Sequence, residues 1–389
     1  MRQPASRPPL PHGGSLPGLI ALLVTLGLAA CTPERGPILI GLAGPFSQPR
    51  GISMQQAAEL AVKEINARGG VNGRRLELRL LDDSANEDVA LRVAQGLYDD
   101  PRVVAVLGHL TSGASRAAAR VYGGGDHPVL MISPSASSPD LSGMSPWVFR
   151  VCPSDLRFGP RLAQVARQEL GARRVGVIYV NNDYGRGVRQ TFVREFRGLG
   201  GEVVEQDPAL TSTATLEPYL VRMQRAGGVD ALMLAVERGG AELALREMAR
   251  LGIRWPVLGG DALTGIEALG PLAEGLRVSL PYLPDQAGEA NAVFVAAYAR
   301  AYPGQHPDHR GAGAYDIVQL LARALAEVGT DRRALRDYVA QVNGQARPAY
   351  EGVTGRIAFD AAGDVPAKPV VIGVVRDGRL VSGGGGGGG

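Results

Sequence analysis

Short apolar runs alternate with longer amphipathic stretches from residue 37 almost to the end of this chain of 389 residues. Most of the runs are continuously hydrophobic, which is typical of strands that are covered on both faces. The stretches between them have helical spacing, so the pattern predicts an α/β fold with parallel sheets and right-handed crossovers. The predicted strands cover 38–43, 76–81, 103–107, 129–132, 175–180, 203–204, 231–236, 256–258, 276–280 and, as a short further run, 357–359. The predicted helices cover 53–67, 87–98, 112–122, 156–169, 185–198, 214–226, 239–251, 288–301, 312–328 and 331–341.

Two segments carry more specific sheet signals. Glu77 and Arg79 alternate with apolar residues in the second predicted strand, which indicates a position at a sheet edge. Near the end of the chain, the dipeptide Asp377-Gly378 separates the apolar runs 370–375 and 379–381. This dipeptide is typical of a two-residue hairpin turn, so we expect a terminal β-hairpin here.

The predicted units are too many for one compact sheet. The chain is also longer than the roughly 250–300 residues that usually share one core. The series divides near residues 150–154, and the helices predicted after residue 280 have few strands beside them. We therefore expect two domains, with the chain returning to the first of them after residue 280.

The N-terminal region has the features of a bacterial lipoprotein signal. Arg2 and Arg7 precede an apolar run over 16–30, and the run ends in Leu28-Ala29-Ala30-Cys31. The run is short for a membrane helix, which needs about 20 apolar residues. We expect residues 1–30 to be a removable signal peptide and Cys31 to be the lipid attachment site. The alternatives are an uncleaved anchor or a cytoplasmic protein with an apolar start. At the other end, residues 381–389 are expected to form a flexible glycine tail.

Composition excludes several function classes. The net charge is only +3, from 41 basic and 38 acidic residues, and no basic block is present, which argues against nucleic acid as a partner. Cys152 is the one cysteine besides Cys31, so it is expected to be a buried small hydrophobe and not a zinc ligand. We expect no metal and no cofactor.

Catalytic chemistry also finds little support. None of the five histidines forms an evident pair with a nucleophile, and the chain has neither a Gly-x-Ser-x-Gly elbow nor a phosphate-binding loop. His109 is the only histidine beside a candidate loop. We therefore expect a binding protein and not an enzyme.

Candidate binding residues follow the ends of the predicted strands, because ligands of open parallel sheets lie beyond the carboxyl ends of the strands. Ser112, in the loop 108–115, opens a predicted helix whose free amides would attract an anion. The alternative is simple helix capping by Thr111 or Ser112. The loop 133–139 holds four serines and two prolines, and it either offers hydroxyls and carbonyls to a polar ligand or is an ordinary connection.

Two further candidates belong to the second series of strands. Tyr184 follows the strand at 175–180 and either forms an aromatic wall of a cleft or packs on its own helix start. Asp261 follows the strand at 256–258 and either pairs with an ammonium group or caps a short helix. An anion-binding loop in one domain and an acidic group with an aromatic in the other would suit an amino-acid zwitterion held between two halves.

Five stretches of this chain resemble a known family, the type I periplasmic solute-binding proteins, and in particular the leucine/isoleucine/valine-binding group that serves ABC transporters. The resemblance covers nearly all of residues 37–380. Its most specific parts are AVKEINARGGVNG at 61–73 and LMISPSASSPDLS at 130–142, followed by GHLTSGAS at 108–115, DYGRG at 183–187 and AYDI at 314–317.

The resemblance implies two Rossmann-like lobes joined by a three-stranded hinge. The first lobe would comprise 37–151 plus 283–353 and the second 152–282 plus 354–380, with crossovers near 151–154, 280–284 and 352–356. It also implies that Ser112 binds the ligand carboxylate and that Tyr184 contacts the ligand. Ser135, Ala136 and Ser137 would bind the amino and carboxylate groups, and Asp261 would pair with the ammonium.

The chain also departs from this family. Thr111 replaces a cysteine of some members, Glu237 replaces an aromatic residue, and Arg50 replaces a tyrosine over the side-chain pocket. A polar or charged amino acid or an amide is therefore as well suited as a branched-chain ligand. Alternatively, Arg50 and Glu237 point to solvent or pair with each other.

The resemblance implies a function as well. The chain would be a periplasmic, lipid-anchored receptor that binds a small molecule by hinge closure and delivers it to an ABC permease in the inner membrane. The alternative is a ligand sensor of the same fold with no role in transport. The identity of the ligand, the membrane that carries the anchor and the oligomeric state stay open.

Overall fold

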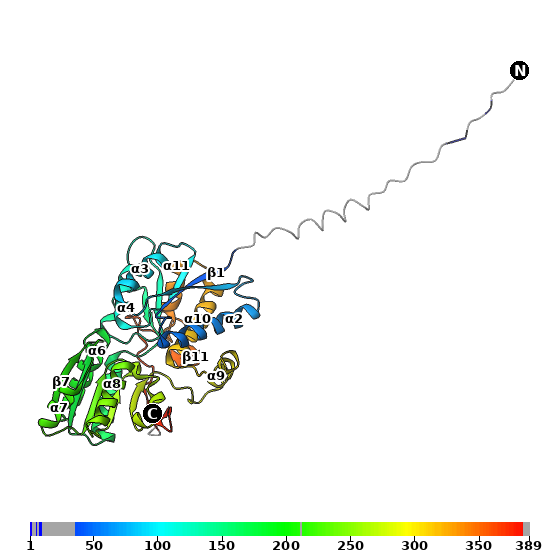
Figure 1. The fold of residues 1–389 in the computed structure, drawn as a ribbon. Helices are drawn as coiled ribbons and strands as arrows, with labels where there is room; N and C mark the ends of the chain where they lie inside the picture. The colour runs from blue at the N-terminus through cyan, green and yellow to red at the C-terminus, as the bar shows by residue number, and fades with distance from the viewer. Residues whose placement is uncertain (2–4, 6–7, 10–35, 211, 384–389) are drawn as a thin grey trace. The chain divides into compact units, whose positions relative to one another are not determined.

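Two β-sheets with helices on both faces form the centre of the fold (Figure 1). The computed structural model describes residues 1, 5, 8–9, 36–210 and 212–383. The chain divides into the segment Met1–Pro37 and the unit Ile38–Gly389, and the architecture below is that of the second unit. The predicted signal run and Cys31 lie outside the described residues. Where the structure is described, no helix combines the length and the apolar character needed to cross a membrane.

The first sheet is entirely parallel and has the strand order β2-β1-β3-β4-β5. Its strands are β1 (Ile38–Gly44), β2 (Leu76–Asp82), β3 (Val103–Leu107), β4 (Leu130–Ser133) and β5 (Val148–Arg150). Strand β2 lies at the edge, which confirms the prediction from its alternating pattern. The helices of this part are α2 (Pro49–Ala67), α3 (Glu87–Tyr98), α4 (Ser112–Tyr122), α9 (Glu289–Ala301), α10 (His309–Val328) and α11 (Arg332–Gln341).

The second sheet has the order β14-β13-β10-β9-β8-β6-β7. It comprises β6 (Arg174–Val180), β7 (Glu202–Ala209), β8 (Ala231–Ala235), β9 (Val257–Gly259), β10 (Arg277–Leu280), β13 (Val371–Arg376) and β14 (Arg379–Ser382). Only the pairs of β13 with β10 and with β14 are antiparallel. The helices beside it are α5 (Asp155–Gln164), which continues as a π-turn over Val165–Glu169, α6 (Asp183–Gly198), α7 (Glu217–Arg225) and α8 (Arg238–Arg250). Short 3₁₀ turns cover Pro139–Leu141, Asp261–Leu263 and Ile266–Leu272.

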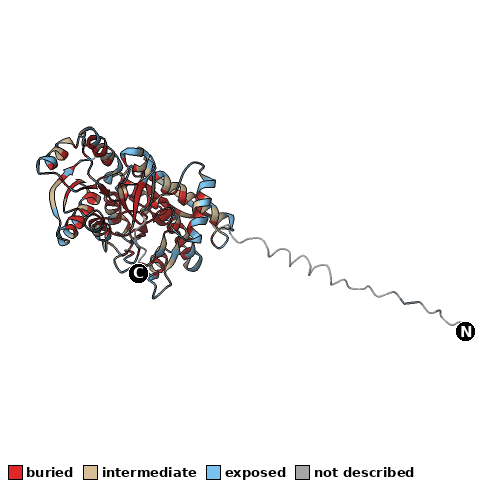
Figure 2. Ribbon diagram, turned by 90° about the horizontal axis from the view of Figure 1, so that it is seen from below, coloured by how far each residue is buried: buried red, intermediate tan, exposed pale blue. Residues whose placement is uncertain are grey.

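Each sheet is covered by apolar residues on both faces, which explains the continuous hydrophobicity of the strands. On the first sheet, one core joins the strands to α2, α10 and α11, and the other joins them to α3 and α4. The second sheet likewise separates two cores. Figure 2 shows the buried residues in the strands and the inner faces of the helices, and the exposed residues on the outer faces.

The third segment that connects the two sheets lies later in the chain than expected. A small hairpin of β11 (Tyr350–Gly352) and β12 (Gly355–Ile357) precedes it. Ile357, Phe359 and Val365 are buried in the core of the first sheet, and the rings of Phe359 and Phe149 meet edge to face with centroids 5.1 Å apart. The boundary expected at 353/354 and the crossover expected at 352–356 are therefore wrong, because these apolar side chains hold the chain on the first sheet until Val365.

The terminal hairpin is confirmed, and it shortens the expected tail. Asp377 and Gly378 both have positive φ angles, 50° and 69°, as a two-residue hairpin turn requires. Val381 and Ser382 pair with β13, so they belong to the second sheet and not to a flexible tail. Residues 384–389 lie outside the described part.

A buried polar cluster ties the hairpin β11–β12 to this third connection. The Asp316 carboxylate, on α10, accepts hydrogen bonds from the backbone amides of Val353 and Thr354, at 2.7 and 2.9 Å, and from the Thr354 hydroxyl. Lys368 donates to the same hydroxyl over 2.6 Å and is only 2% exposed. Burial lowers the pKa of Lys368 to about 8, although Asp316 opposes this effect.

Candidate functional site

A cavity of about 320 Å³ lies beyond the carboxyl ends of both sheets. Its lining residues follow β2, β3 and β4 of the first sheet and β6, β8 and β9 of the second. This is the place that the sheet-end argument predicted. Six of the predicted site residues line it, namely Arg50, Ser112, Ser135, Tyr184, Glu237 and Asp261.

The N-terminus of α4 forms one wall. Ser112, Gly113 and Ala114 all line the cavity, and the amides of a first helical turn have no partner within the helix. Thr111 occupies the N-cap position but makes no capping hydrogen bond with its side chain, and Ser112 Oγ instead accepts the amide of Ser138 at 3.2 Å. The alternative of helix capping by either residue is therefore wrong. The wall offers amide donors and the partial positive charge of a helix N-terminus, which suits a carboxylate.

The serine-rich loop after β4 contributes one side chain to the cavity. Ser133 orders the loop, because its hydroxyl donates to the carbonyl of His109 at 2.7 Å and accepts the amide of Ala136 at 3.0 Å. Ser135 lines the cavity, whereas Ala136 and Ser137 do not. Ala136 directs its carbonyl toward Arg150, and the fully buried Ser137 hydroxyl has no hydrogen-bond partner among the described residues.

Asp261 presents a carboxylate on the opposite wall. It is 3% exposed, and its Oδ2 lies 3.4 Å from both the Ser135 hydroxyl and Nε2 of His309. The N-cap of the short turn that follows is Gly260, so the capping alternative for Asp261 is wrong. An acidic group with two long polar contacts can accept a hydrogen bond from an incoming ammonium.

Tyr184 lines the cavity and also packs against the second sheet, to which its helix belongs. Its hydroxyl accepts the amide of Ala262 at 3.2 Å, directly after Asp261. Burial, with Asp261 nearby, raises the pKa of the Tyr184 hydroxyl well above its usual value, so it is protonated at neutral pH. The ring packs against both cores of the second sheet.

The start of α10 adds two residues that sequence reasoning missed. His309 and Arg310 are 2% and 5% exposed, and Arg310 lines the cavity. Asp308 caps the helix by accepting the amides of Arg310 and Gly311, so α10 begins three residues before the predicted start at 312. Arg310 pairs with the Asp308 carboxylate at 2.8 Å and donates to the carbonyl of Asp261 at 3.3 Å. Burial opposes ionisation of Asp308, but Arg310 and His309 outweigh it and lower its pKa.

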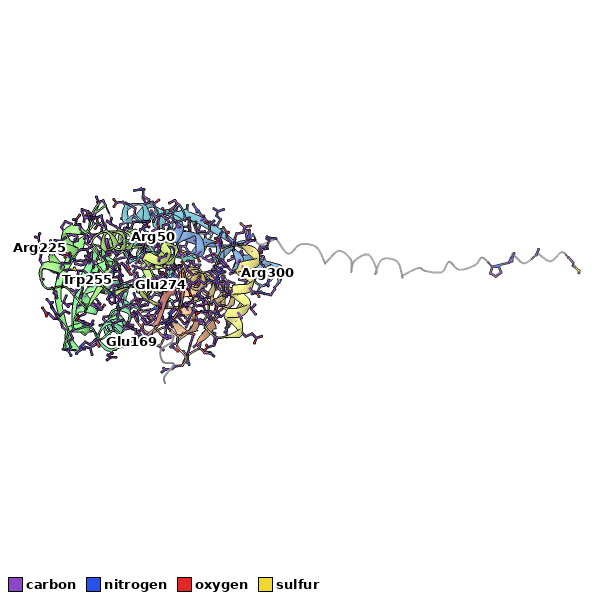
Figure 3. The ribbon with its side chains drawn as sticks, turned by 60° about the horizontal axis from the view of Figure 1, so that its bottom comes forward. Arg50, Glu169, Arg225, Trp255, Glu274 and Arg300 are labelled. Carbon is purple, nitrogen blue, oxygen red and sulfur yellow. The ribbon has the colours of Figure 1, made fainter. Side chains whose placement is uncertain are left out.

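Arg50 and Glu237 form an ion pair, and both line the cavity. Figure 3 labels Arg50 among the side chains of the molecule. Arg50 lies in the first turn of α2, and Glu237 is the N-cap residue of α8, so the pair joins elements of the two sheets. Of the alternatives stated above, pairing is confirmed, and both side chains still line the cavity. A second ion pair, Arg116 with Asp183, joins α4 to α6 in the same way.

His109 and Cys152 have structural surroundings. His109 is fully buried, and its ring nitrogens lie 2.6 Å from the Asp83 carboxylate and 3.3 Å from the Tyr122 hydroxyl. Cys152 is buried, and burial raises the pKa of its thiol. Neither residue lines the cavity. In the described part of the chain, no group of three or more His, Cys, Asp or Glu side chains has the arrangement of a metal site.

Comparison with known protein families shows to which family the chain belongs. The sequence profile of the periplasmic binding proteins matches residues 37–379. The chain belongs to the periplasmic binding protein family. The resemblance to its leucine/isoleucine/valine-binding group and the expected fold class are confirmed.

Three similar proteins illustrate the group. The Leu/Ile/Val-binding protein homolog 1 of Brucella abortus (strain 2308) is 26% identical over 333 residues, which are 84% of this chain and 87% of that protein. The ABC transporter substrate-binding protein of Desulfitobacterium hafniense, solved in complex with Leu, is 32% identical with a TM-score of 0.77 and covers 89% of this chain and 99% of its own. The ABC transporter solute binding protein of Rhodopseudomonas palustris BisB5, solved in complex with 3,4-dihydroxybenzoic acid, is 25% identical with a TM-score of 0.77 and covers 89% and 95%.

These findings bear on the general function. The family and the similar proteins are substrate-binding proteins, which confirms that this periplasmic binding protein is not an enzyme. Family membership also implies an extracytoplasmic location and a small-molecule ligand.

Proposed function

We propose that this periplasmic binding protein is the lipid-anchored receptor of an ABC importer and that it binds an α-amino acid or a related small polar molecule. The observation that carries the proposal is the convergence of Ser112, Ser135 and Asp261 on one cavity, with the N-terminus of α4 facing the ligand space. These groups match the two charges of a zwitterion. The similar proteins support the anionic half, because Leu and 3,4-dihydroxybenzoic acid, held by two of them, share a carboxylate.

In this mechanism the ligand carboxylate docks on the amides of Ser112, Gly113 and Ala114, and its ammonium donates to Asp261. The two lobes, which exchange the chain near 151–154, 280–284 and after Val365, then close on the ligand. The ligand shifts this equilibrium only by as much as it binds the closed form better. A micromolar ligand needs about 8 kcal/mol, and charge-assisted hydrogen bonds contribute roughly 1.5–3 kcal/mol each.

The charged lining of the cavity favours a polar side chain on the ligand. Arg50, Glu237 and Arg310 line it together with Glu87 and Asp88, and Leu110 is the one large aliphatic residue among the described lining residues. A branched aliphatic side chain would leave these charged groups less solvated without replacing their hydrogen bonds. Glutamine, arginine and short amides satisfy them.

A thermal-shift screen tests the ligand class. We expect polar and amide-bearing amino acids to raise the melting temperature more than leucine, because binding to the native state stabilises it by mass action. Preference for leucine over every polar ligand would contradict the proposed side-chain recognition. No shift with any amino acid would contradict the head-group assignment.

Calorimetry on a serine variant then tests the carboxylate site. Ser112→Ala should weaken binding by about 1–3 kcal/mol, because a buried hydrogen-bonding group is lost beside the helix N-terminus. Ser382→Ala, at an exposed edge position on β14, is the matched control and should bind as the parent does. Equal affinities for both variants would remove Ser112 from the site.

The anchor and the importer have separate tests. Cys31→Ser should move the protein from the membrane fraction to the soluble fraction, because no thiol would remain to carry the lipid. Deletion of the protein should abolish uptake of the radiolabelled ligand found in the screen. Uptake that continues unchanged would contradict the transport role.

A further inference from the structure

A second cavity, of about 260 Å³, meets the ligand cavity at Arg50 and Glu237. These two residues are the ones that line both spaces, so the ion pair stands between them. The second cavity lies at the carboxyl ends of β6, β7 and β8, and its wall is largely aliphatic. The aliphatic residues are Val180, Ala209, Leu210, Leu216, Val236 and Leu243.

The aliphatic wall distinguishes this cavity from the other space beside the ion pair. A third cavity also reaches Arg50 and Glu237, but it carries several more charged residues, among them Arg238, Glu242 and Glu267. In the second cavity, the ion pair supplies the only charged lining residues of the described chain. Leu216 and Val236 are 1% and 2% exposed, so the floor is firmly packed, whereas Leu210 is 65% exposed at the rim. An apolar group that entered would be desolvated on several sides.

Arg50 and Glu237 can separate without either charge being left buried and unpaired. Arg50 and Glu237 are 25% and 28% exposed in their side chains, and Arg50 Nε is also held by Gln48 Oε1 at 2.8 Å. A ligand amide placed between them offers a carbonyl to the guanidinium and an N–H to the carboxylate. Both charges then keep a hydrogen-bond partner, which removes the main penalty for separating a pair.

We infer that the second cavity is a subsite for the apolar end of an elongated ligand. The ligand class is an α-amino acid whose side chain carries an amide and then an apolar group, such as a γ-glutamyl amide. Its head group lies on α4 and Asp261, its amide lies between Arg50 and Glu237, and its apolar end contacts Leu243 and its neighbours. The inference rests on the proposed function, because the amino-acid head group must first bind at the N-terminus of α4 and Asp261.

A pair of ligands isolates the contribution of the apolar end. L-glutamine has the head group and the side-chain amide, and L-γ-glutamyl-anilide adds only a phenyl ring. We expect the anilide to bind the full-length protein about tenfold more tightly in calorimetry, a difference of about 1.4 kcal/mol that part of a buried ring can supply.

Variants of Leu243 locate the effect. Leu243 lines the second cavity but not the ligand cavity, and it is partly exposed on α8, so it can be enlarged. Leu243→Trp should fill the space and abolish the advantage of the anilide while glutamine binds as before. Leu243→Met, which keeps the volume, should retain the advantage. Unchanged glutamine binding in each variant reports that the protein is folded.

The outcomes separate the two proposals. If glutamine binds but the anilide gains nothing, or if its gain survives Leu243→Trp, the subsite is refuted and the head-group site stands. If leucine binds and glutamine does not, the placement of the amide at the ion pair is refuted. If no amino acid binds at all, both the subsite and the proposed function fall.

Discussion

The carboxyl group of Asp155 is buried without an ion pair or a hydrogen-bond partner among the described residues. The residue opens α5, is 0% exposed, and donates its amide to the carbonyl of Ser137 at 2.8 Å. Neither carboxyl oxygen accepts a hydrogen bond from the described residues. Burial raises the pKa of Asp155 from 3.8 to about 8, although Ser137 and Arg150 nearby act in the opposite direction.

This shift makes folding stability depend on pH with a definite sign. Below about pH 4 both the folded and the unfolded chain carry the proton. Between pH 4 and pH 8 the unfolded chain loses it while the folded chain keeps it, so the free energy of unfolding falls as the pH rises. A shift of about 4 pH units at about 1.4 kcal/mol each amounts to roughly 5 kcal/mol lost by pH 8.

Asp155→Asn removes this dependence, because an amide does not ionise in this range. At pH 8 the variant avoids the several kcal/mol that the parent loses through Asp155. At every pH it loses about 1–3 kcal/mol of stability, because its buried amide donors lack hydrogen-bond partners. At pH 4.5 the parent has lost only about 1 kcal/mol through Asp155, so the variant should be no more stable than the parent. The difference in free energy of unfolding between variant and parent should therefore increase from pH 4.5 to pH 8.

Urea denaturation followed by circular dichroism measures it at half-unit pH steps. Asp126→Asn, at an exposed loop position, is the matched control and should follow the parent at every pH. If the difference between Asp155→Asn and the parent changes by less than about 1 kcal/mol across this range, the carboxyl is ionised in the folded protein and the reasoning fails.

Three further predictions concern other polar contacts of the structure. In a double-mutant cycle on the free energy of unfolding without ligand, Arg50→Ala and Glu237→Gln should couple by about 0.2–1 kcal/mol, since the pair is partly exposed, and the coupling should shrink at high salt; full additivity would show that the pair does not stabilise the ligand-free protein. Between pH 8 and pH 10.5 the unfolded chain still protonates Lys368 and the folded chain does not, so in urea titrations the stability of the parent relative to Lys368→Met should rise by on the order of 3 kcal/mol; a constant difference between the two proteins would refute the lowered pKa. Asp308→Ala should lower the free energy of unfolding by about 1 kcal/mol through the lost helix cap. It should also lower the affinity for the ligand, because Arg310 loses its ion-pair partner. An unchanged affinity would show that Arg310 does not contribute to the binding site.

Much of the fold and of the cavity was predictable from the sequence, because both depend on local patterns. Buried strands are continuously apolar, so the cores of the two sheets could be predicted from short windows. Ser112, Tyr184 and Asp261 could be found because the ends of parallel strands are themselves sequence positions. The elements that escaped are short or half-exposed. β5 has three residues, and β7 has mostly partly exposed residues where a two-residue strand was predicted.

The features that sequence reasoning missed or left open depend on contacts that sequence spacing does not report. Arg310 reaches the cavity because Asp308 starts α10 early, and an Asp before an apolar helical pattern is a capping signal that could have placed this start. Arg50 and Glu237 are separated by 187 residues, so no local pattern distinguishes a pair from two solvated charges. The third crossover was misplaced because Phe359 and Val365 pack on the first sheet through tertiary contacts.

The buried Lys368 has a practical consequence for observing this protein at work. The chain has only two lysines, and its other basic residues are arginines, whose guanidinium keeps its proton and could not shed charge at such a position. Lys63 on α2 is exposed, whereas Lys368 is shielded from reagents. An amine-reactive dye should therefore label Lys63 and the N-terminal amine but not Lys368, and the fluorescence of the dye on Lys63 can follow the helix that carries Arg50 during ligand capture.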